Sequence, residues 1–180
     1  MESWKRNLYI LWFTQILSVM SFGFGLPFMP FYIQELGVVE PDQIKLFTGI
    51  LSMAPAVTMA FMAPIWGMLS DRFGRKLMIM RAMFAASFVI GGMGFAGNVW
   101  HLVILRLCQG LFTGTITAAT AFVAADAPSE RMSYALGFMS SATFIGFSIG
   151  PVIGGYFAET VGYRFSFMVG AVLMFVGFLL

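Results

Sequence analysis

Charged residues divide this chain into long uncharged stretches. The first stretch, residues 8–32, contains no Asp, Glu, Lys or Arg, and a helix needs about 20 mostly apolar residues to cross the hydrocarbon core of a membrane. Only 10% of the 180 residues are charged and 59% are hydrophobic, whereas a typical soluble domain is about 25% charged. Because so few charges cannot cover a water-soluble fold, the sequence predicts an integral membrane protein.

Six stretches have the length of a membrane-spanning helix. Transmembrane strands would alternate apolar and polar residues over about 10 positions, which this sequence lacks, so we expect an all-α fold. The first stretch is also longer than the apolar core of a secretory signal, which has about 7–15 residues. The last is still apolar at Leu180, so we expect the chain to be part of a longer protein. The expected spans are approximately 8–32, 46–69, 77–96, 100–125, 134–157 and 165–180.

Lysine and arginine residues predict the orientation, because they are enriched in cytoplasmic loops. With the N-terminus inside, Lys45 and Arg164 lie outside and Arg106 lies within a span. We therefore expect a multi-pass protein of the cell membrane, inner or plasma, with a cytoplasmic N-terminus. The remaining basic residues then face the cytoplasm: Lys5, Arg6, Arg72, Arg75, Lys76, Arg81 and Arg131.

A short pattern occurs twice, in the same order and with the same spacing. Three spans separate the copies, and an odd number of spans inverts the second copy relative to the first. Inverted repeats of this kind are found in many secondary transporters. The pattern predicts two inverted three-helix repeats, over about 8–96 and about 100–180. The first copy consists of Gly67, Asp71 and Gly74, and the second copy consists of Gly155, Glu159 and Gly162.

The loop between the second and third spans has the ordered sequence G-x-L-x-D-x-x-G-R-K. Gly67 permits close helix contact, and Gly74 permits a tight turn. Asp71 can interact with the N-terminus of another helix. Arg75 offers a planar donor fork to a carboxylate, for which Asp126 at the end of the fourth span is the candidate. The alternative is a generic short loop that is basic only because it is cytoplasmic.

Arg106 lies about two turns into the fourth span, where a charge costs at least roughly 2.5–3.5 kcal/mol unless it is paired or hydrated. We expect it to face a cavity or the bundle interior. As a cavity-lining group it would sense substrate charge or the protonation of a nearby acid. The alternative is a structural arginine capped by carbonyls. Polar residues continue at helical spacing on the same side: Gln109, Thr113, Thr117 and Thr120. Further cavity candidates share one face of the first span: Gln15, Ser18, Phe22 and Met29.

The fifth span has a glycine at every fourth position, Gly146, Gly150 and Gly154. These glycines open a groove for close backbone packing. Pro151 removes a helix hydrogen bond and favours a kink. The pattern therefore predicts a tightly packed helix seam.

These motifs resemble those of the major facilitator superfamily. The charged loop has the form of that family's signature between its second and third helices. Span four resembles the family's fourth-helix pattern, through Arg106, Gln109, Gly110 and Gly114. Span five is similar to the pattern G-x-x-x-G-P-x-x-G-G of proton-coupled antiporters, through Gly146, Gly150, Pro151, Gly154 and Gly155. Residues 4–8, 26–32 and 36–37 are similar to the drug:H⁺ antiporter group.

The resemblance implies a transporter of twelve helices in two halves, with this chain as the amino-terminal half and the carboxy-terminal half absent. It implies that Asp71 contacts the other half while Arg75 pairs with Asp126, so that Gly67, Asp71, Gly74, Arg75 and Lys76 form a cytoplasmic gating loop. It also implies that the glycine seam of span five packs against the other half and resists leak. Several relatives of this type have an acid within the first span, which this chain lacks. The coupling proton would then be carried by Glu35, by Asp71 and Asp126, or by the other half.

The expected function is proton-coupled efflux of hydrophobic or amphiphilic small molecules by alternating access. The alternatives are an uptake permease of the same superfamily, and a six-span channel or membrane assembly protein. No enzyme is expected, because the sequence has no metal-ligand cluster, phosphate-binding glycine loop or nucleophile with its base. We expect no metal and no cofactor besides the proton gradient. The expected partners are small-molecule substrates, the lipid bilayer and the other half, and the net charge of +2 does not favour nucleic acid.

Overall fold

The structure, a computed structural model, describes residues 3–25, 27–112 and 114–180. Throughout these residues the regular structure is helical, which confirms the predicted all-α fold. The helices are α1 (Ser3–Gly23), α2 (Met29–Glu35), α3 (Pro41–Phe73), α4 (Arg75–Gly94), α5 (Val99–Phe112), α6 (Thr115–Asp126), the short 3-10 helix η1 (Ser129–Arg131), α7 (Met132–Thr160) and α8 (Tyr163–Leu179).

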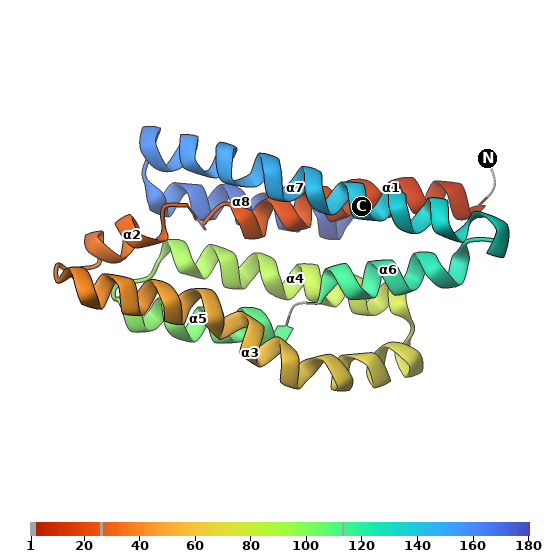
Figure 1. Cartoon of the computed structure of the whole chain (residues 1–180), viewed down its shortest axis with the longest axis horizontal. Coiled ribbons are helices and arrows are strands. Elements are labelled where there is room, and N and C mark those ends of the chain that lie inside the picture. Colours follow the sequence, from red (N-terminus) through yellow and green to blue (C-terminus); the bar gives the residue numbers. More distant parts are fainter. Residues whose placement is uncertain (1–2, 26, 113) are drawn as a thin grey trace.

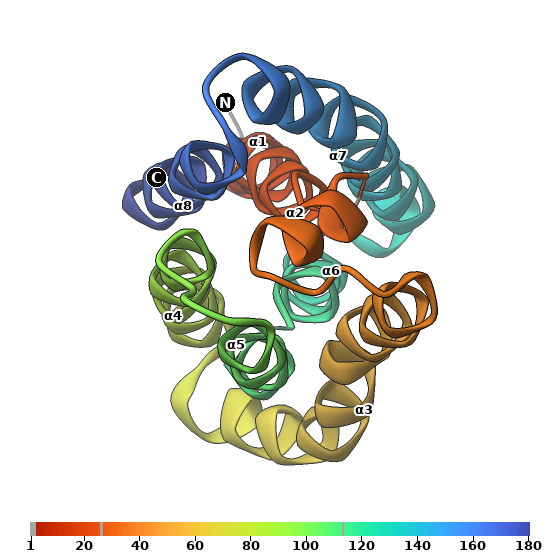
Figure 2. The same cartoon turned by 90° about the vertical axis from the view of Figure 1, so that its left-hand side faces the viewer.

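The long helices lie side by side along one axis (Figure 1). The N-terminus, the turn from α3 to α4 and the turn from α6 to α7 share one end, which we call the loop end. The short α2 lies at the opposite end, with the turns from α4 to α5 and from α7 to α8. Viewed along the bundle, α7 and α8 flank α1, while α3, α4 and α5 form the other side (Figure 2). The most extensive helix–helix contacts are those of α4 with α8, α1 with α7, and α3 with α5.

Four helical stretches of the described chain are long and apolar enough to cross a membrane: Pro41–Phe73, Arg75–Gly94, Val99–Asp126 and Ser129–Thr160. α8 is a shorter apolar helix. Much of α3 has no partner in this bundle, and its Phe61 and Met68 are 75% and 65% exposed. The outer face of α3 therefore suits contact with lipid or with further helices.

Two predicted spans are divided. The stretch 8–32 forms α1 and the separate short helix α2, which has a proline in its first turn. The stretch 100–125 forms α5 and α6, with Gly114 between them at φ +137°. Glycine is required there because L side chains rarely adopt such a backbone conformation. Apolar length alone does not report these interruptions, and Val99–Asp126 taken together still has the length and composition of one span.

Gly74 makes the predicted tight turn, with φ +91° and ψ 141° between α3 and α4. Gly162 has nearly the same backbone conformation between α7 and α8, with φ 108° and ψ 159°. Both glycines belong to the pattern that occurs twice in the sequence. The two copies therefore share a local structure as well as a spacing, in agreement with an internal repeat.

The glycine seam of α7 packs against α1. A Cβ atom on Gly150 would lie 2.6 Å from the carbonyl oxygen of Met20, and one on Gly154 would lie 2.6 Å from the Cα of Phe24. A Cβ on Gly146 would lie 2.7 Å from Val19. The expectation that this seam packs against another half is wrong for these three glycines, because a helix of the same chain fills the groove.

The neighbouring motif residues differ in their surroundings. A Cβ on Gly23 would lie 3.2 Å from the Cδ of Pro151, so this proline also faces α1. Nothing in the described chain lies within 4 Å of a Cβ on Gly155. Only Gly155 of this motif therefore presents an open face.

Candidate functional site

Arg106 lies inside the bundle and is 5% exposed. Its Nη1 donates a hydrogen bond to Oε1 of Gln109 at 3.1 Å. Its Nε has no hydrogen-bond partner in the described part of the chain, and neither does the buried Nε2 of Gln15 on α1. A Cβ on Gly25, two residues after α1, would lie 2.8 Å from the ring of Phe167 and 3.4 Å from Nη2 of the arginine, so glycine there leaves room for both side chains. Because a buried charge with an open donor is costly, this centre is suited to bind an acceptor such as a carboxylate.

The interruption of the fourth span changes the predicted polar stripe. Thr115, which the sequence reasoning missed, is buried and lies 2.9 Å from Ser18 through their hydroxyl oxygens. Thr117 instead lines a pocket at the loop end. Helical spacing does not carry across Gly114, so Thr117 does not continue the face of Arg106. Thr113 lies outside the described residues.

The other cavity candidates are mostly enclosed in this structure. Gln15 and Ser18 are buried in α1, and Phe22 is half-buried. Met29 belongs to α2 and is packed into the hydrophobic core. Their role as cavity residues stays a prediction.

A pocket of about 390 Å³ lies at the loop end between α3, α4 and α6. The predicted gating loop contributes Gly67, Asp71 and Arg75 to its wall. Asp71 is exposed, and a Cβ on Gly67 would meet nothing within 4 Å, so no close helix contact forms at that glycine within the described chain. The wall is completed by Ala56, Met59, Ala60, Ala63, Trp66, Ser70, Met78, Arg81, Ala82, Gly114, Thr117, Ala118 and Ala121.

Arg75 and Asp126 have separate partners. Nη1 of Arg75 donates to the backbone carbonyl of Ala121 on α6. The Oδ2 of Asp126 accepts a hydrogen bond from Nδ2 of Asn7 on α1 at 2.9 Å. The predicted direct ion pair is therefore not formed in this structure, although the loop and the end of the fourth span do meet. Asn7 is an unpredicted member of the site, since it carries no charge and belongs to no motif.

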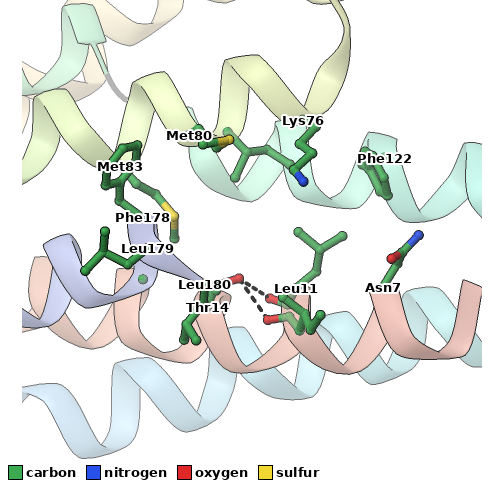
Figure 3. A pocket seen from close by; sticks show the side chains of 13 residues that line it. Asn7, Leu11, Thr14, Lys76, Met80, Met83, Phe122, Phe178, Leu179 and Leu180 are labelled. Atoms are coloured by element: carbon green, nitrogen blue, oxygen red, sulfur yellow. Dashed lines mark hydrogen bonds between the residues drawn. The ribbon is translucent and has the colours of Figure 1, made fainter. Parts of the chain in front are cut away.

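Lys76 points from α4 into a second pocket at the loop end, of about 230 Å³ (Figure 3). Asn7, Leu11 and Thr14 of α1 line the other side of this pocket. The hydroxyl of Thr14 donates to the carbonyls of Ile10 and Leu11, each at 3.0 Å, so it is satisfied within its own helix. The lysine is thus the charged group that faces this pocket.

Arg81 was assigned from the sequence to the cytoplasmic surface. It lies instead in the second turn of α4, with its guanidinium carbon 3.3 Å from the centre of the Trp66 ring. Its Nη2 donates to the carbonyl of Phe112 at 3.3 Å. The position of an arginine inside the third apolar stretch is the one feature of the sequence that hints at this contact.

Glu35 lies at the opposite end, where its Oε1 is 3.8 Å from Nε of Arg164. This links the end of α2 to the start of α8. Glu35 is the last residue of the short helix α2, and its place at a membrane boundary stays a prediction. Whether it carries a proton stays a prediction.

Replacing Glu35 with glutamine should lower the stability by less than about 1 kcal/mol, because exposed ion pairs contribute little. The side chains of Arg164 and Glu35 are 55% and 45% exposed. Thermal denaturation of the purified chain in detergent would measure the change, with Glu159→Gln as an exposed control. A loss above about 2 kcal/mol would show that the pair matters more than its exposure indicates.

Comparison with known proteins places this bundle in a family. The Major Facilitator Superfamily model matches residues 11–180. The multidrug resistance protein MdtG of Proteus mirabilis is 39% identical over 178 residues, which are 99% of this chain and 44% of that protein. A multi-drug resistance efflux pump PmrA homolog of Lactococcus lactis is 43% identical over 172 residues, which are 95% of this chain and 42% of that protein. The chain thus spans less than half the length of these curated relatives.

A solved structure has the same fold. The crystal structure of the human organic anion transporter MFSD10 matches with a TM-score of 0.80 at 17% identity, covering 99% of this chain and 48% of that one. The helical bundle, its membrane-length helices and these matches define a multi-pass membrane protein. The chain belongs to the Major Facilitator Superfamily.

Proposed function

We propose that this chain forms one six-helix half of a transporter that exports hydrophobic or amphiphilic small molecules in exchange for protons, by alternating access. The observation that carries the proposal is the buried Arg106, whose Nε has no partner in the described chain. Ionisable groups inside a membrane protein usually mark substrate or ion pathways. The proposal includes no enzymatic step, no metal and no cofactor besides the proton gradient.

The relatives support the substrate class. Those compared above are named as a multidrug resistance protein and as a multi-drug resistance efflux pump homolog. Because the chain covers 44% and 42% of their lengths, we propose that a second set of helices completes the cavity. The exposed apolar face of α3 suits such a contact.

We further propose that the loop end is cytoplasmic and acts as the moving latch. Arg75 holds α6 through the carbonyl of Ala121, and Asn7 holds the end of α6 through Asp126. Asp71 is exposed beside them and is placed to contact a helix of the other half. Breaking these contacts would release α6 from α4 and α1 when the cavity opens inward.

The proposal is tested by drug transport into vesicles that hold the full-length protein, of which this chain would be the first half. An acidic vesicle interior should drive uptake of a fluorescent hydrophobic drug, because proton exit is coupled to drug entry. Collapse of the pH difference should stop it. Asp71→Asn and Arg106→Ala should each lower the initial rate by at least about tenfold, which corresponds to about 1.4 kcal/mol in the barrier.

Arg72→Gln serves as the control, because Arg72 is exposed and is not one of the five predicted gating residues of the loop. It should transport at the rate of the unchanged protein. Drug movement in the same direction as protons would support the uptake permease instead. Full activity of both the Asp71 and the Arg106 variants would contradict the site assignment.

A further inference from the structure

The end of α5 lies inside a membrane-length stretch and needs donors from outside its own helix. α5 ends at Phe112 and α6 begins at Thr115. The last four carbonyls of a helix have no partner within it. In a bilayer each unsatisfied carbonyl costs several kcal/mol. Neighbouring side chains must therefore satisfy the carbonyls that the interruption exposes.

α3 and α4 supply these donors. Nε1 of Trp66 donates to the carbonyl of Leu111 at 2.7 Å. Nη2 of Arg81 donates to the carbonyl of Phe112 at 3.3 Å. The two side chains also stack on each other, so they form one cap over the end of α5.

Arg81 is held there without a carboxylate: in the ranges described, no ion pair includes it. Its Nε and Nη1 are buried and have no hydrogen-bond partner among the described atoms. A cation over a tryptophan ring is attracted by the negative face of the ring, and more strongly when it is desolvated. The C-terminal end of a helix also attracts positive charge. The ring of Trp66 and the end of α5 therefore take the place of an acidic partner.

The two parts of the fourth span pack against different helices. α4 packs against both parts, but α5 otherwise packs against α3, whereas α6 otherwise packs against α1 and α7. The pocket of about 390 Å³ adjoins Gly114 and Thr117, so the start of α6 has open space on that side. α6 also carries the carbonyl of Ala121 that accepts the hydrogen bond from Arg75. The position of α6 thus determines whether Arg75 of the gating loop can donate to the carbonyl of Ala121.

We propose that Trp66 and Arg81 are positioning residues that hold the fourth span in its interrupted form and so place α6 against the gating loop. Without their two donors, the carbonyls of Leu111 and Phe112 bond instead to the amides of Thr115 and Ile116, one turn later. The helical hydrogen bonds of α5 then run on into the first turn of α6, and α6 turns away from the loop. Both forms satisfy the same carbonyls, so the side-chain cap decides between them. The proposal goes beyond transport and does not depend on it.

Hydrogen exchange of the purified chain in lipid nanodiscs tests the proposal. In the interrupted form the amides of Thr115 and Ile116 lie in the first turn of α6 and have no acceptor within that helix. Arg81→Gln and Trp66→Phe should therefore slow exchange at these two amides by about tenfold, the effect of one hydrogen bond. A general loss of stability would speed exchange everywhere. The direction of the change separates the two effects.

Three further variants complete the test. Arg81→Lys keeps a cationic donor and should restore the exchange of the unchanged chain. Arg72→Gln is the matched control, since Arg72 also lies over a ring, at 5.4 Å from the centre of Phe73, but is not one of the two donors to the end of α5. Trp66→Phe keeps an aromatic ring under Arg81 and removes the Nε1 donor. If Arg81→Gln does not fold, Trp66→Phe alone tests the proposal. Unchanged or faster exchange at the two amides in Trp66→Phe would overturn the proposal, as would failure of Arg81→Lys to restore it.

Discussion

Gly110→Ala is expected to prevent α5 from packing against α3, with a loss of about 3 kcal/mol in stability, the upper end of the usual range for overpacking. A Cβ atom at this position would overlap the backbone carbonyl of Pro55 and the hydroxyl of Thr58. A side chain can rotate away from a new methyl group, but a backbone carbonyl can move only if the whole helix moves. Thermal denaturation in detergent and the yield of monodisperse protein would measure the effect.

Gly137→Ala is the matched control for this substitution. Gly137 lies in α7, and a Cβ there would meet nothing within 4 Å in the described chain. Alanine favours helix over glycine by up to about 1 kcal/mol, so this variant should be as stable as the unchanged chain or slightly more stable. Equal stability of the Gly110 and Gly137 variants would contradict the close approach of α3 and α5.

The second large effect is expected at the seam between α1 and α7. Gly154→Ala should destabilise the chain by about 1–3 kcal/mol, the usual range for overpacking. Its Cβ would lie 2.6 Å from both the Cα and the carbonyl oxygen of Phe24, so α1 and α7 would have to separate. Chemical or thermal denaturation of the purified chain would measure the loss.

The neighbouring Gly155→Ala makes the same chemical change on the open face of α7, where a Cβ would meet nothing within 4 Å. It should leave the stability of this chain unchanged within about 1 kcal/mol. In a full-length protein the same substitution reports whether another helix covers that face. If the Gly154→Ala variant were as stable as the Gly155→Ala variant, the close packing of α7 against α1 at Gly154 would be contradicted.

The fold was largely predictable because charge spacing marks where the chain can cross a membrane. The turn at Gly74 was predictable for a local reason, since a glycine between two apolar stretches allows a positive φ. The interruption at Gly114 was not, because the apolar pattern is the same on both sides of it. Whether a helix stops there depends on donors from Trp66 and Arg81, which are distant in sequence.

The sequence predicted which residues belong to the candidate site better than it predicted which groups they contact. Burial of Arg106 followed from the cost of a charge in lipid, and the structure places it inside the bundle. The predicted pairing of Arg75 with Asp126 is not formed. Two opposite charges at the same end of a bundle can each bind a different partner. Asn7 and the carbonyl of Ala121 are such partners, and no charge or motif identifies them in a sequence.

The divided fourth span also constrains how the chain is assembled. α5 has 14 residues and α6 has 12, so at about 1.5 Å per residue neither is long enough to cross a hydrocarbon core of about 30 Å. The ribosome makes Trp66 and Arg81 before it makes residue 112, so both donors precede the carbonyls that they cap. A circular permutant that begins at α5 would synthesise α5 and α6 before α3 and α4. It would have to insert its divided span before Trp66 and Arg81 exist to cap it.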